Sequence, residues 1–230
     1  MLSSESHTLD SGLAALDSVS DLITEKVSTS RVLAGINGSL VADSIDAWRQ
    51  DDKHHVHSCV LQPGCLEALA RANTTGWHFG VLSINWCPDL IHAMLLRDMQ
   101  HNPNDSPCWS NRVDGEGRIE LAVSGASAKR ERILTLQEEA GCGVVYVGDS
   151  VTDLPALLAA DLGVLIGSSN TVREFTSKYN VNVEPLSSLH ALKCAVDKGP
   201  TAPRTVWAAE SWADIDRMVI QHPGILGSQL

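Results

Sequence analysis

Apolar residues recur at spacings of three and four through the first fifty residues of the chain. The stretch LAALDSVSDLITEKV (13–27) has this spacing, and VLAGINGSLVADSIDAW (32–48) resumes it after a break that contains Gly and Asn. Such a period is typical of helices with one buried face. We therefore predict helices over residues 9–50 and no strand of a parallel sheet there.

Beyond residue 58 the pattern changes to short apolar runs that alternate with amphipathic segments. A run such as VVYVG, apolar throughout, is typical of a parallel strand that is covered on both faces. The predicted strands are residues 77–84, 144–148, 163–167, 181–186 and 206–209. One predicted helix follows Pro63-Gly64, and the others span residues 87–100, 127–141, 153–161, 169–179, 187–196 and 211–222.

This alternation predicts an α/β fold built on a doubly wound, Rossmann-like parallel sheet. Residues 113–121 (VDGEGRIEL) interrupt it and predict a hairpin around a Gly-containing turn. We divide the chain into a helical segment, residues 1–57, and an α/β core, residues 58–230.

Composition and charge narrow the possible partners. The 230 residues are 43% hydrophobic and 20% charged, which is ordinary for a globular domain. The net charge of −11, with no Lys/Arg run, argues against nucleic acid and against an acidic membrane surface. No apolar run reaches the roughly 20 residues of a membrane span. The sequence gives no indication of the oligomeric state.

The N-terminus and the cysteines indicate a reduced compartment inside the cell. Residues 1–12 lack the basic and apolar regions of a secretory signal, and the six cysteines form no C-x-x-C pair. We expect a cytoplasmic protein, or an organellar one if an N-terminal extension precedes Met1.

The candidate chemistry centres on GDSVTD, residues 148–153. Asp149 follows the predicted strand 144–148, and Asp153 lies four residues later at the start of a helix, so both carboxylates face one point. Sites in such folds lie at the carboxyl ends of the strands. Two hard oxygen donors suit Mg²⁺, which takes one or two carboxylates and keeps waters or phosphate oxygens. The alternative is that either Asp merely caps the following helix.

The segment YVGDSVTDLPALLAADLGVLIGSS (146–169) resembles the fourth motif of haloacid-dehalogenase-like (HAD) phosphatases. In that family a phosphoryl group is transferred to an Asp and then hydrolysed, with Mg²⁺ between protein and phosphoryl oxygens. FGVLSINWC resembles the second motif and implies that Ser83 hydrogen-bonds the phosphoryl group. SGASAKRERI is placed like the third motif and implies that Lys129 offsets phosphate charge. Residues 1–57 would then be a partial helical cap, and residues 58–230 the HAD-like core.

Further phrases are similar to the phosphatase domain of plant thiamin-monophosphate phosphatases. They are RVLAGIN, VLQPGC, LSINWCPDLI, GDSVTDL and the terminal SWADI, from about residue 30 to residue 217. This resemblance implies a small phosphorylated substrate, thiamin monophosphate, with Ser83, Asn85 and Trp86 as substrate-binding residues. Trp86 and Cys87 would form a wall of the pocket, where the indole stacks on a heteroaromatic ring.

The first motif of the family, D-x-D-x-T, does not occur in these 230 residues. Its first Asp is the nucleophile, and its strand lies between those that bear the second and fourth motifs. Asp10, Asp17 and Asp21 are the nearest carboxylates, but they fall in a helical pattern. We therefore expect little or no turnover from this chain, weak metal binding, and damage to the fold.

Two explanations compete for the missing motif. The motif would lie upstream of Met1 in a longer gene product, which we favour, or the chain is a pseudo-phosphatase that binds a phosphorylated ligand or a protein without hydrolysis. A response-regulator-like phosphoacceptor is disfavoured because no acidic pair ends an earlier strand. Separately, His55, His57 and Cys59 alternate and would suit Zn²⁺, although a solvated connection explains them better.

Overall fold

The computed structural model describes residues 8–50, 61–96, 106–141, 143–167, 169–187 and 205–226. By their internal contacts these residues form two compact units. The first comprises residues 1–20 and 125–230, and the second comprises residues 21–124. The predicted boundary at 57/58 lies outside the described residues, so the division into 1–57 and 58–230 stays a prediction.

A four-stranded parallel sheet forms the centre of the first unit. Its order is β5-β6-β8-β7, and every neighbouring pair is parallel. The strands are β5 (Val145–Gly148), β6 (Leu162–Ile166), β7 (Asn182–Pro185) and β8 (Thr205–Ala209). All four were predicted from apolar runs, and the α/β class with a Rossmann-like parallel sheet is confirmed.

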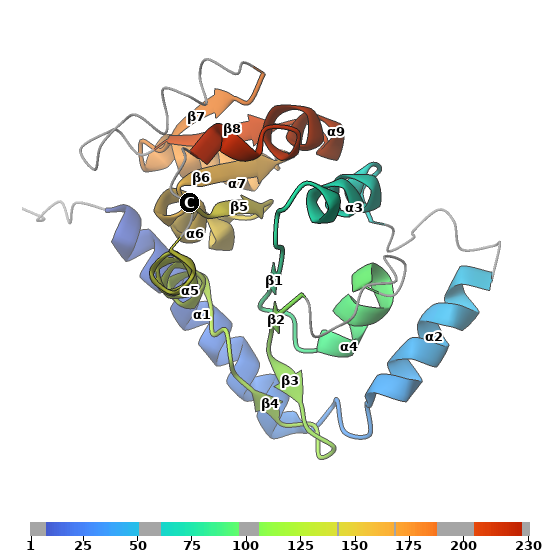
Figure 1. Cartoon of the computed structure of the whole chain (residues 1–230). Coiled ribbons are helices and arrows are strands. Elements are labelled where there is room, and N and C mark those ends of the chain that lie inside the picture. Colours follow the sequence, from blue (N-terminus) through green and yellow to red (C-terminus); the bar gives the residue numbers. More distant parts are fainter. Residues whose placement is uncertain are drawn as a thin grey trace, which may run out of the picture. The chain divides into compact units, whose positions relative to one another are not determined.

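Helices alternate with these strands along the chain (Figure 1). They are α5 (Ala126–Ala140), the 3-10 turn η3 (Val151–Asp153), α6 (Leu154–Ala159), α7 (Asn170–Lys178), α9 (Trp212–Ile215), its π-helical continuation η4 (Asp216–Ile220) and the 3-10 turn η5 (Pro223–Leu226). Helix α6 packs on β5 and β6. Helix α7 contacts β7, and α9 contacts β8. The predicted helix 187–196 lies almost wholly outside the described residues.

The core of this unit lies between β6, β8 and α6. All five residues of β6 are buried, as expected of a strand covered on both faces. Leu154 and Leu157 of α6, with Val164 and Val206, are at most 1% exposed. Burial of such side chains stabilises a fold by about 1.5–3 kcal/mol each. Two serines cap helices of this unit: Ser169 Oγ accepts from Val172 N, and Ser211 Oγ accepts from Asp214 N.

The second unit is built from helices and short strands. Its elements are the rest of α1 (Leu9–Ser30), α2 (Gly38–Gln50), α3 (Cys65–Thr74), β1 (Val81–Leu82), α4 (Pro88–Ile91), the π-helical η2 (His92–Leu96), β2 (Cys108–Trp109), β3 (Arg112–Val113) and β4 (Ile119–Glu120). The two predicted N-terminal helices are α1 and α2, and β3 with β4 is the predicted hairpin. The parallel pair of β1 with β2 was not predicted.

The strands that carry the second- and fourth-motif residues belong to different sheets. Strand β1 pairs with β2, and β5 pairs with β6 at one edge of the four-stranded sheet. Among the described strands, none pairs with both β1 and β5. The expectation that the lack of the first-motif strand damages the fold stays a prediction.

Helix α1 supplies a cap to a helix more than a hundred residues away in the sequence. Helix α5 begins after Gly125, which has no side chain that could accept hydrogen bonds from the first N–H groups of the helix. Asp17 takes that role within the first unit: Oδ1 accepts from Ala126 N at 2.7 Å, and Oδ2 accepts from Ser127 N and Oγ. A carboxylate at a helix N-terminus also favours the helix dipole. One of the three N-terminal carboxylates therefore has a structural role.

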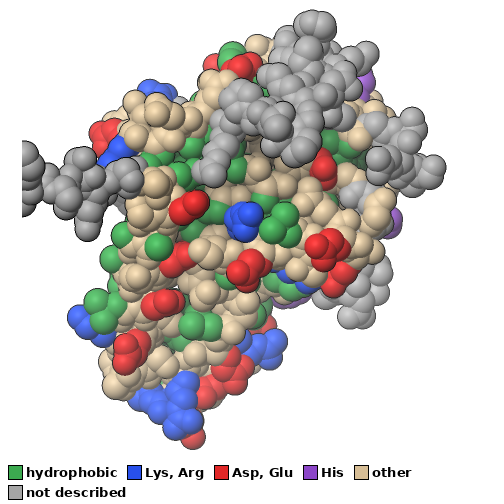
Figure 2. Space-filling model, turned by 90° about the vertical axis from the view of Figure 1, so that its left-hand side faces the viewer, with side chains coloured by type: hydrophobic (Ala, Val, Ile, Leu, Met, Phe, Trp, Pro, Cys, Tyr) green, Lys and Arg blue, Asp and Glu red, His purple; other side chains and the backbone are tan. Residues whose placement is uncertain are grey.

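The surface is charged but mixed in sign. On the face shown in Figure 2, acidic and basic side chains are interspersed among scattered apolar ones. In the second unit, Glu116 faces Arg118 at 3.1 Å and Arg31 at 3.8 Å. Among the described helices, none is both long and apolar enough to cross a lipid bilayer.

The cap that Asp17 provides is testable. Replacing Asp17 by Ala leaves the N–H groups of Ala126 and Ser127 without this acceptor, so the free energy of unfolding should fall by about 1 kcal/mol. Urea denaturation would measure it. Asp21→Ala, one turn further along α1 at an exposed position, is the matched control and should change little. Equal effects of the two substitutions would contradict a specific cap.

Candidate functional site

The carboxyl end of β5 is organised around the buried carboxylate of Asp153, which is 4% exposed. Its Oδ2 accepts from the backbone N–H groups of Asp149 (3.2 Å) and Ser150 (3.0 Å) and from Ser150 Oγ (2.6 Å). The alternative weighed from the sequence thus holds in part, because Asp153 caps the turn that follows β5. These bonds fix the GDSVTD loop to the first turn of the next helix.

The other oxygen of Asp153 forms a buried ion pair with Lys129. Lys129 Nζ lies 2.6 Å from Asp153 Oδ1, and the Lys129 side chain is 7% exposed. Lys129 comes from the first turn of α5, and Asp153 from the end of η3. Lys129, predicted to offset phosphate charge, and Asp153, predicted as a magnesium ligand, are therefore in direct contact within the first unit.

Tyr146, which no motif in the sequence singles out, joins this pair. Its hydroxyl donates to Asp153 Oδ1 at 2.7 Å, the same oxygen that Lys129 contacts. Burial, and then the neighbouring Asp153 carboxylate, raise the pKa of Tyr146 above its ordinary value, so the hydroxyl keeps its proton. The alternation of β5 aims Tyr146 inward, a signal available in the sequence, but its partner depended on the fold.

The surroundings of Asp153 favour its ionised form. Burial alone would raise the pKa of this carboxyl, but the Lys129 charge and hydrogen bonds from Lys129, Ser150 and Tyr146 lower it below the usual range. Gly148 makes the close packing possible, since a Cβ there would lie 2.5 Å from Asp153 Cβ. Asp153 is therefore ionised where it contacts Lys129.

Asp149 differs from Asp153 in being exposed at the strand end. Among the described residues its carboxylate has no hydrogen-bond or ion-pair partner. Asp153 already accepts five hydrogen bonds on two oxygens, which have about four lone-pair positions. Asp149 thus has free carboxylate oxygens in this arrangement, whereas those of Asp153 are occupied. The assignment of Asp149 and Asp153 as magnesium ligands stays a prediction.

Asp149 is not part of a larger metal-binding cluster among the described residues. In that part of the chain, no three His, Cys, Asp or Glu side chains lie close enough together to hold a metal ion. The candidate zinc ligands His55, His57 and Cys59 lie outside the described residues.

Ser83 lies in the second unit, directly after β1. Its backbone N–H donates to Trp109 O at 2.9 Å, which extends the β1–β2 pairing by one residue. Ser83 Oγ accepts from Asn85 N at 3.1 Å, and Asn85 Oδ1 accepts from Cys87 N at 2.7 Å. The predicted substrate-binding residues Ser83, Asn85 and Trp86 thus share one tightly turned loop. Their convergence with Lys129 and Asp149 of the first unit stays a prediction.

A buried Asn111, 1% exposed, holds this loop in place. Its side-chain amide donates to Ile84 O at 3.1 Å and to Val123 O at 2.9 Å, and its Oδ1 accepts from the N–H groups of Ala122 and Val123. Its own backbone N–H donates to Asn85 O. No local pattern singles out Asn111, because a lone Asn in a polar, turn-rich stretch is typical of a loop residue.

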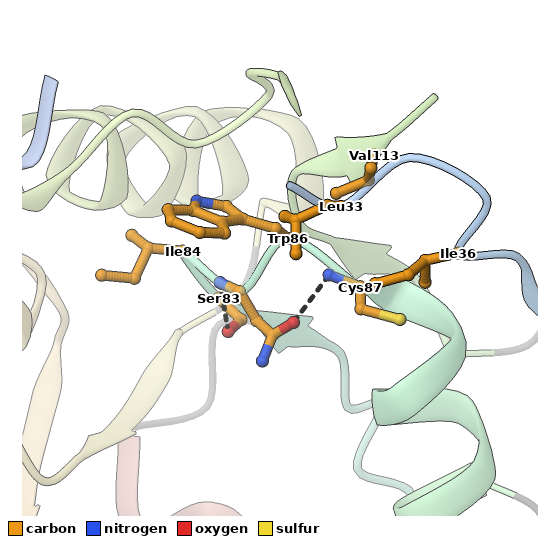
Figure 3. Close-up of a pocket in the computed structure, with 8 residues that line it drawn as sticks. Leu33, Ile36, Ser83, Ile84, Trp86, Cys87 and Val113 are labelled. Atoms are coloured by element: carbon orange, nitrogen blue, oxygen red, sulfur yellow. Dashed lines mark hydrogen bonds between the residues drawn. The ribbon is translucent and has the colours of Figure 1, made fainter. Parts of the chain in front are cut away.

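The same loop forms one wall of a cavity of about 480 Å³ in the second unit. Figure 3 shows its lining, with Leu33 and Val113 together on one side and Cys87 beside Ile36. The lining residues are Leu33, Ile36, Ser83, Ile84, Asn85, Trp86, Cys87 and Val113. Trp86 and Cys87 both line this cavity. Their role as a wall of the substrate pocket stays a prediction.

The fold and site define a protein of the α/β, Rossmann-like class with a buried lysine–carboxylate pair at the end of a parallel strand. The sequence is 26% identical over 223 residues to a protein of Arabidopsis thaliana named "Bifunctional TH2 protein, mitochondrial". The alignment covers 87% of this chain and 34% of that protein, so the chain spans about a third of the relative's length. No protein-family model and no solved structure matches the chain.

The Lys129–Asp153 pair should dominate the stability of the first unit. Lys129→Met leaves a buried carboxylate without its counter-charge, which should cost about 3–5 kcal/mol of unfolding free energy, measured in urea at pH 7. Lys129→Met combined with Asp153→Asn should recover part of this loss, because the stranded charge is then removed. Arg130→Met, an exposed neighbour on α5, is the control.

The cost of Lys129→Met should also depend on pH in a defined direction. The pKa of Asp153 is lowered in the folded state, so its ionised form stabilises the fold above the unfolded pKa of about 4. That stability is lost as the pH falls through the lower folded value. The difference between the variant and the parent protein should therefore shrink below about pH 4, and a constant difference from pH 7 to pH 3 would contradict this account.

Asn111→Leu tests the anchor of the Ser83 loop. The change keeps the size of the side chain but removes partners from two backbone N–H groups and from the carbonyls of Ile84 and Val123. Each unsatisfied buried group costs about 1–3 kcal/mol, so we expect a loss of at least about 3 kcal/mol by urea denaturation. Arg112→Leu at the next, exposed position should stay near the parent value.

Proposed function

We propose that this chain is the phosphate-handling domain of a HAD-like phosphomonoester hydrolase, with thiamin monophosphate as its substrate. Under this proposal Lys129 offsets the charge of the phosphoryl group, Ser83 hydrogen-bonds it, and Asp149 contributes to a Mg²⁺ site. The chain itself is expected to show little or no turnover, since D-x-D-x-T is not among its residues.

The observation that carries the proposal is the incomplete satisfaction of a buried cation. An ammonium group has three N–H donors, and Lys129 uses one of them on Asp153 among the described residues. A buried charged donor with unused capacity is costly unless an acceptor approaches it, and an anionic acceptor also pairs its charge. A phosphoryl group, with several acceptor oxygens and negative charge, satisfies both needs.

Positioning of Lys129 follows from its neighbours. Asp153 and the backbone N–H groups of the GDSVTD loop keep the ammonium at the carboxyl end of β5, where ligands bind in sheets of this type. Fixed charge of this kind needs no reorganisation when a phosphoryl group gains negative charge, and a single such donor is worth about 10²–10³ in rate.

A magnesium ion suits the exposed carboxylate of Asp149. Mg²⁺ accepts one or two carboxylates and completes its coordination with waters and phosphate oxygens. When bound, it supplies additional positive charge to the phosphoryl oxygens. Two findings support the choice of thiamin monophosphate: the motif resemblance, and the similarity to the plant protein named "Bifunctional TH2 protein, mitochondrial".

A non-catalytic binding role is the second candidate, and one observation favours it for this chain. Of the three carboxylates nearest to a first motif, Asp17 is engaged at the start of α5. Asp10 and Asp21 are exposed on the same helix. None follows a strand, as the attacking carboxylate of the family does.

Calorimetric binding of thiamin monophosphate with and without Mg²⁺, together with an assay of phosphate release, tests the proposal. We expect ligand binding that Mg²⁺ strengthens, and we expect Asp149→Asn to remove the Mg²⁺ effect without lowering stability. Lys129→Ala should abolish binding. Glu174→Gln, an exposed acid on α7, serves as the matched control and should bind like the parent protein.

The outcomes separate the two candidates. Phosphate release that is lost in Asp149→Asn and Lys129→Ala supports the hydrolase. Binding without release supports the non-catalytic role. Binding or release that is indifferent to both substitutions rejects the site, and p-nitrophenyl phosphate as a second substrate shows whether any release depends on the thiamin moiety.

A further inference from the structure

The cavity beside Ser83 combines apolar walls with two unused hydrogen-bond donors. Ser83 Oγ and Asn85 Oδ1 each accept a backbone N–H within the loop. The hydroxyl proton of Ser83 and the side-chain NH₂ of Asn85 have no acceptor in the described part of the chain. No charged side chain is among the cavity's described lining residues. Such a surface suits a ligand that is largely apolar and carries acceptor atoms at one end.

Part of the wall comes from the RVLAGIN phrase, residues 31–37. Leu33 and Ile36 lie in the connection 31–37 between α1 and α2. This connection rests on the β3–β4 hairpin: Gly35 N donates to Gly115 O at 3.3 Å, and Arg31 Nη1 donates to Glu116 O at 3.4 Å. Two independent contacts thus hold the apolar wall opposite the loop of Ser83.

The packing of the connection on the hairpin is close. Gly117, at φ 80°, approaches the backbone of Ala34 so closely that a Cβ would lie 2.6 Å from Ala34 N. Since L side chains rarely adopt this φ, Gly is required here on two grounds. The connection that carries Leu33 and Ile36 is therefore held in place by its packing on the β3–β4 hairpin of the second unit.

We propose that this cavity binds the ring end of the substrate, and that Trp86 and Leu33 determine specificity for a flat heteroaromatic group. The Trp86 indole supplies a stacking face, and Leu33 and Val113 supply the apolar wall (Figure 3). The free donors of Ser83 and Asn85 would meet acceptor atoms of the ligand at the end that carries the phosphate. For the chemistry of its ligand this inference rests on the function proposed above.

A ligand without phosphate separates the two proposals. Calorimetric titration of the full chain with thiamin in Mg²⁺-free buffer reports on the ring site alone, while inorganic phosphate reports on the site around Lys129. Trp86→Leu should weaken thiamin binding about tenfold, and Trp86→Phe, which keeps a stacking face, should recover most of it. Leu33→Ala should weaken thiamin binding several-fold. Val32→Ala is the matched control, since Val32 is 70% exposed, and it should not weaken binding.

Phosphate affinity should be the same in all four variants, and their melting temperatures identify any that fail to fold. Thiamin binding that Trp86→Leu and Leu33→Ala weaken, but Val32→Ala and Trp86→Phe do not, supports the ring site even if the chain releases no phosphate. Absence of thiamin binding, or equal binding by all four variants, overturns it, whatever the phosphate titration shows.

Discussion

The first unit depends on one buried carboxylate that would be unfavourable without its partners. Asp153 collects five hydrogen bonds, from Lys129, Tyr146, Ser150 and the backbone of the GDSVTD loop. Desolvation of an ion in a protein interior costs several kcal/mol, and the contacts repay it only when the geometry is good and every lone pair is used. The strand end, the following turn and α5 are therefore mutually positioned by a single charge.

In this arrangement the two Asp residues of the GDSVTD phrase have different surroundings. Asp153 is saturated with donors and orients Lys129, whereas Asp149 stays exposed and available to a cation. Lys129, in turn, is buried with N–H capacity that Asp153 does not use. The fold holds the ammonium in place through this ion pair. Under the function proposed above, an approaching anion would complete its hydrogen bonding, and stability and ligand recognition would depend on the same pair.

The second unit applies a neutral version of the same principle. Asn111 uses both ends of its amide on four backbone groups, and so it fixes the loop of Ser83, Asn85 and Trp86 without any charge. A buried amide that meets all its partners rigidifies its surroundings, because leaving any of them unpaired is costly. The cavity next to this loop gains its opposite wall from the 31–37 connection, which the hairpin holds.

Local sequence patterns determined much of this protein. Strand-length apolar runs predicted all four strands of the parallel sheet, helical periods predicted α1 and α2, and the four-residue spacing in GDSVTD brought Asp149 and Asp153 to one strand end, because these features depend on neighbours along the chain. Only the tertiary structure decided that Asp17 caps α5 and that Tyr146 and Lys129 contact the same oxygen of Asp153. It also decided that Asn111 anchors the loop of Ser83 and that Leu33 lines the cavity beside it. Those contacts join segments far apart in the sequence, or depend on which side chain fills a buried space, and no local period encodes either.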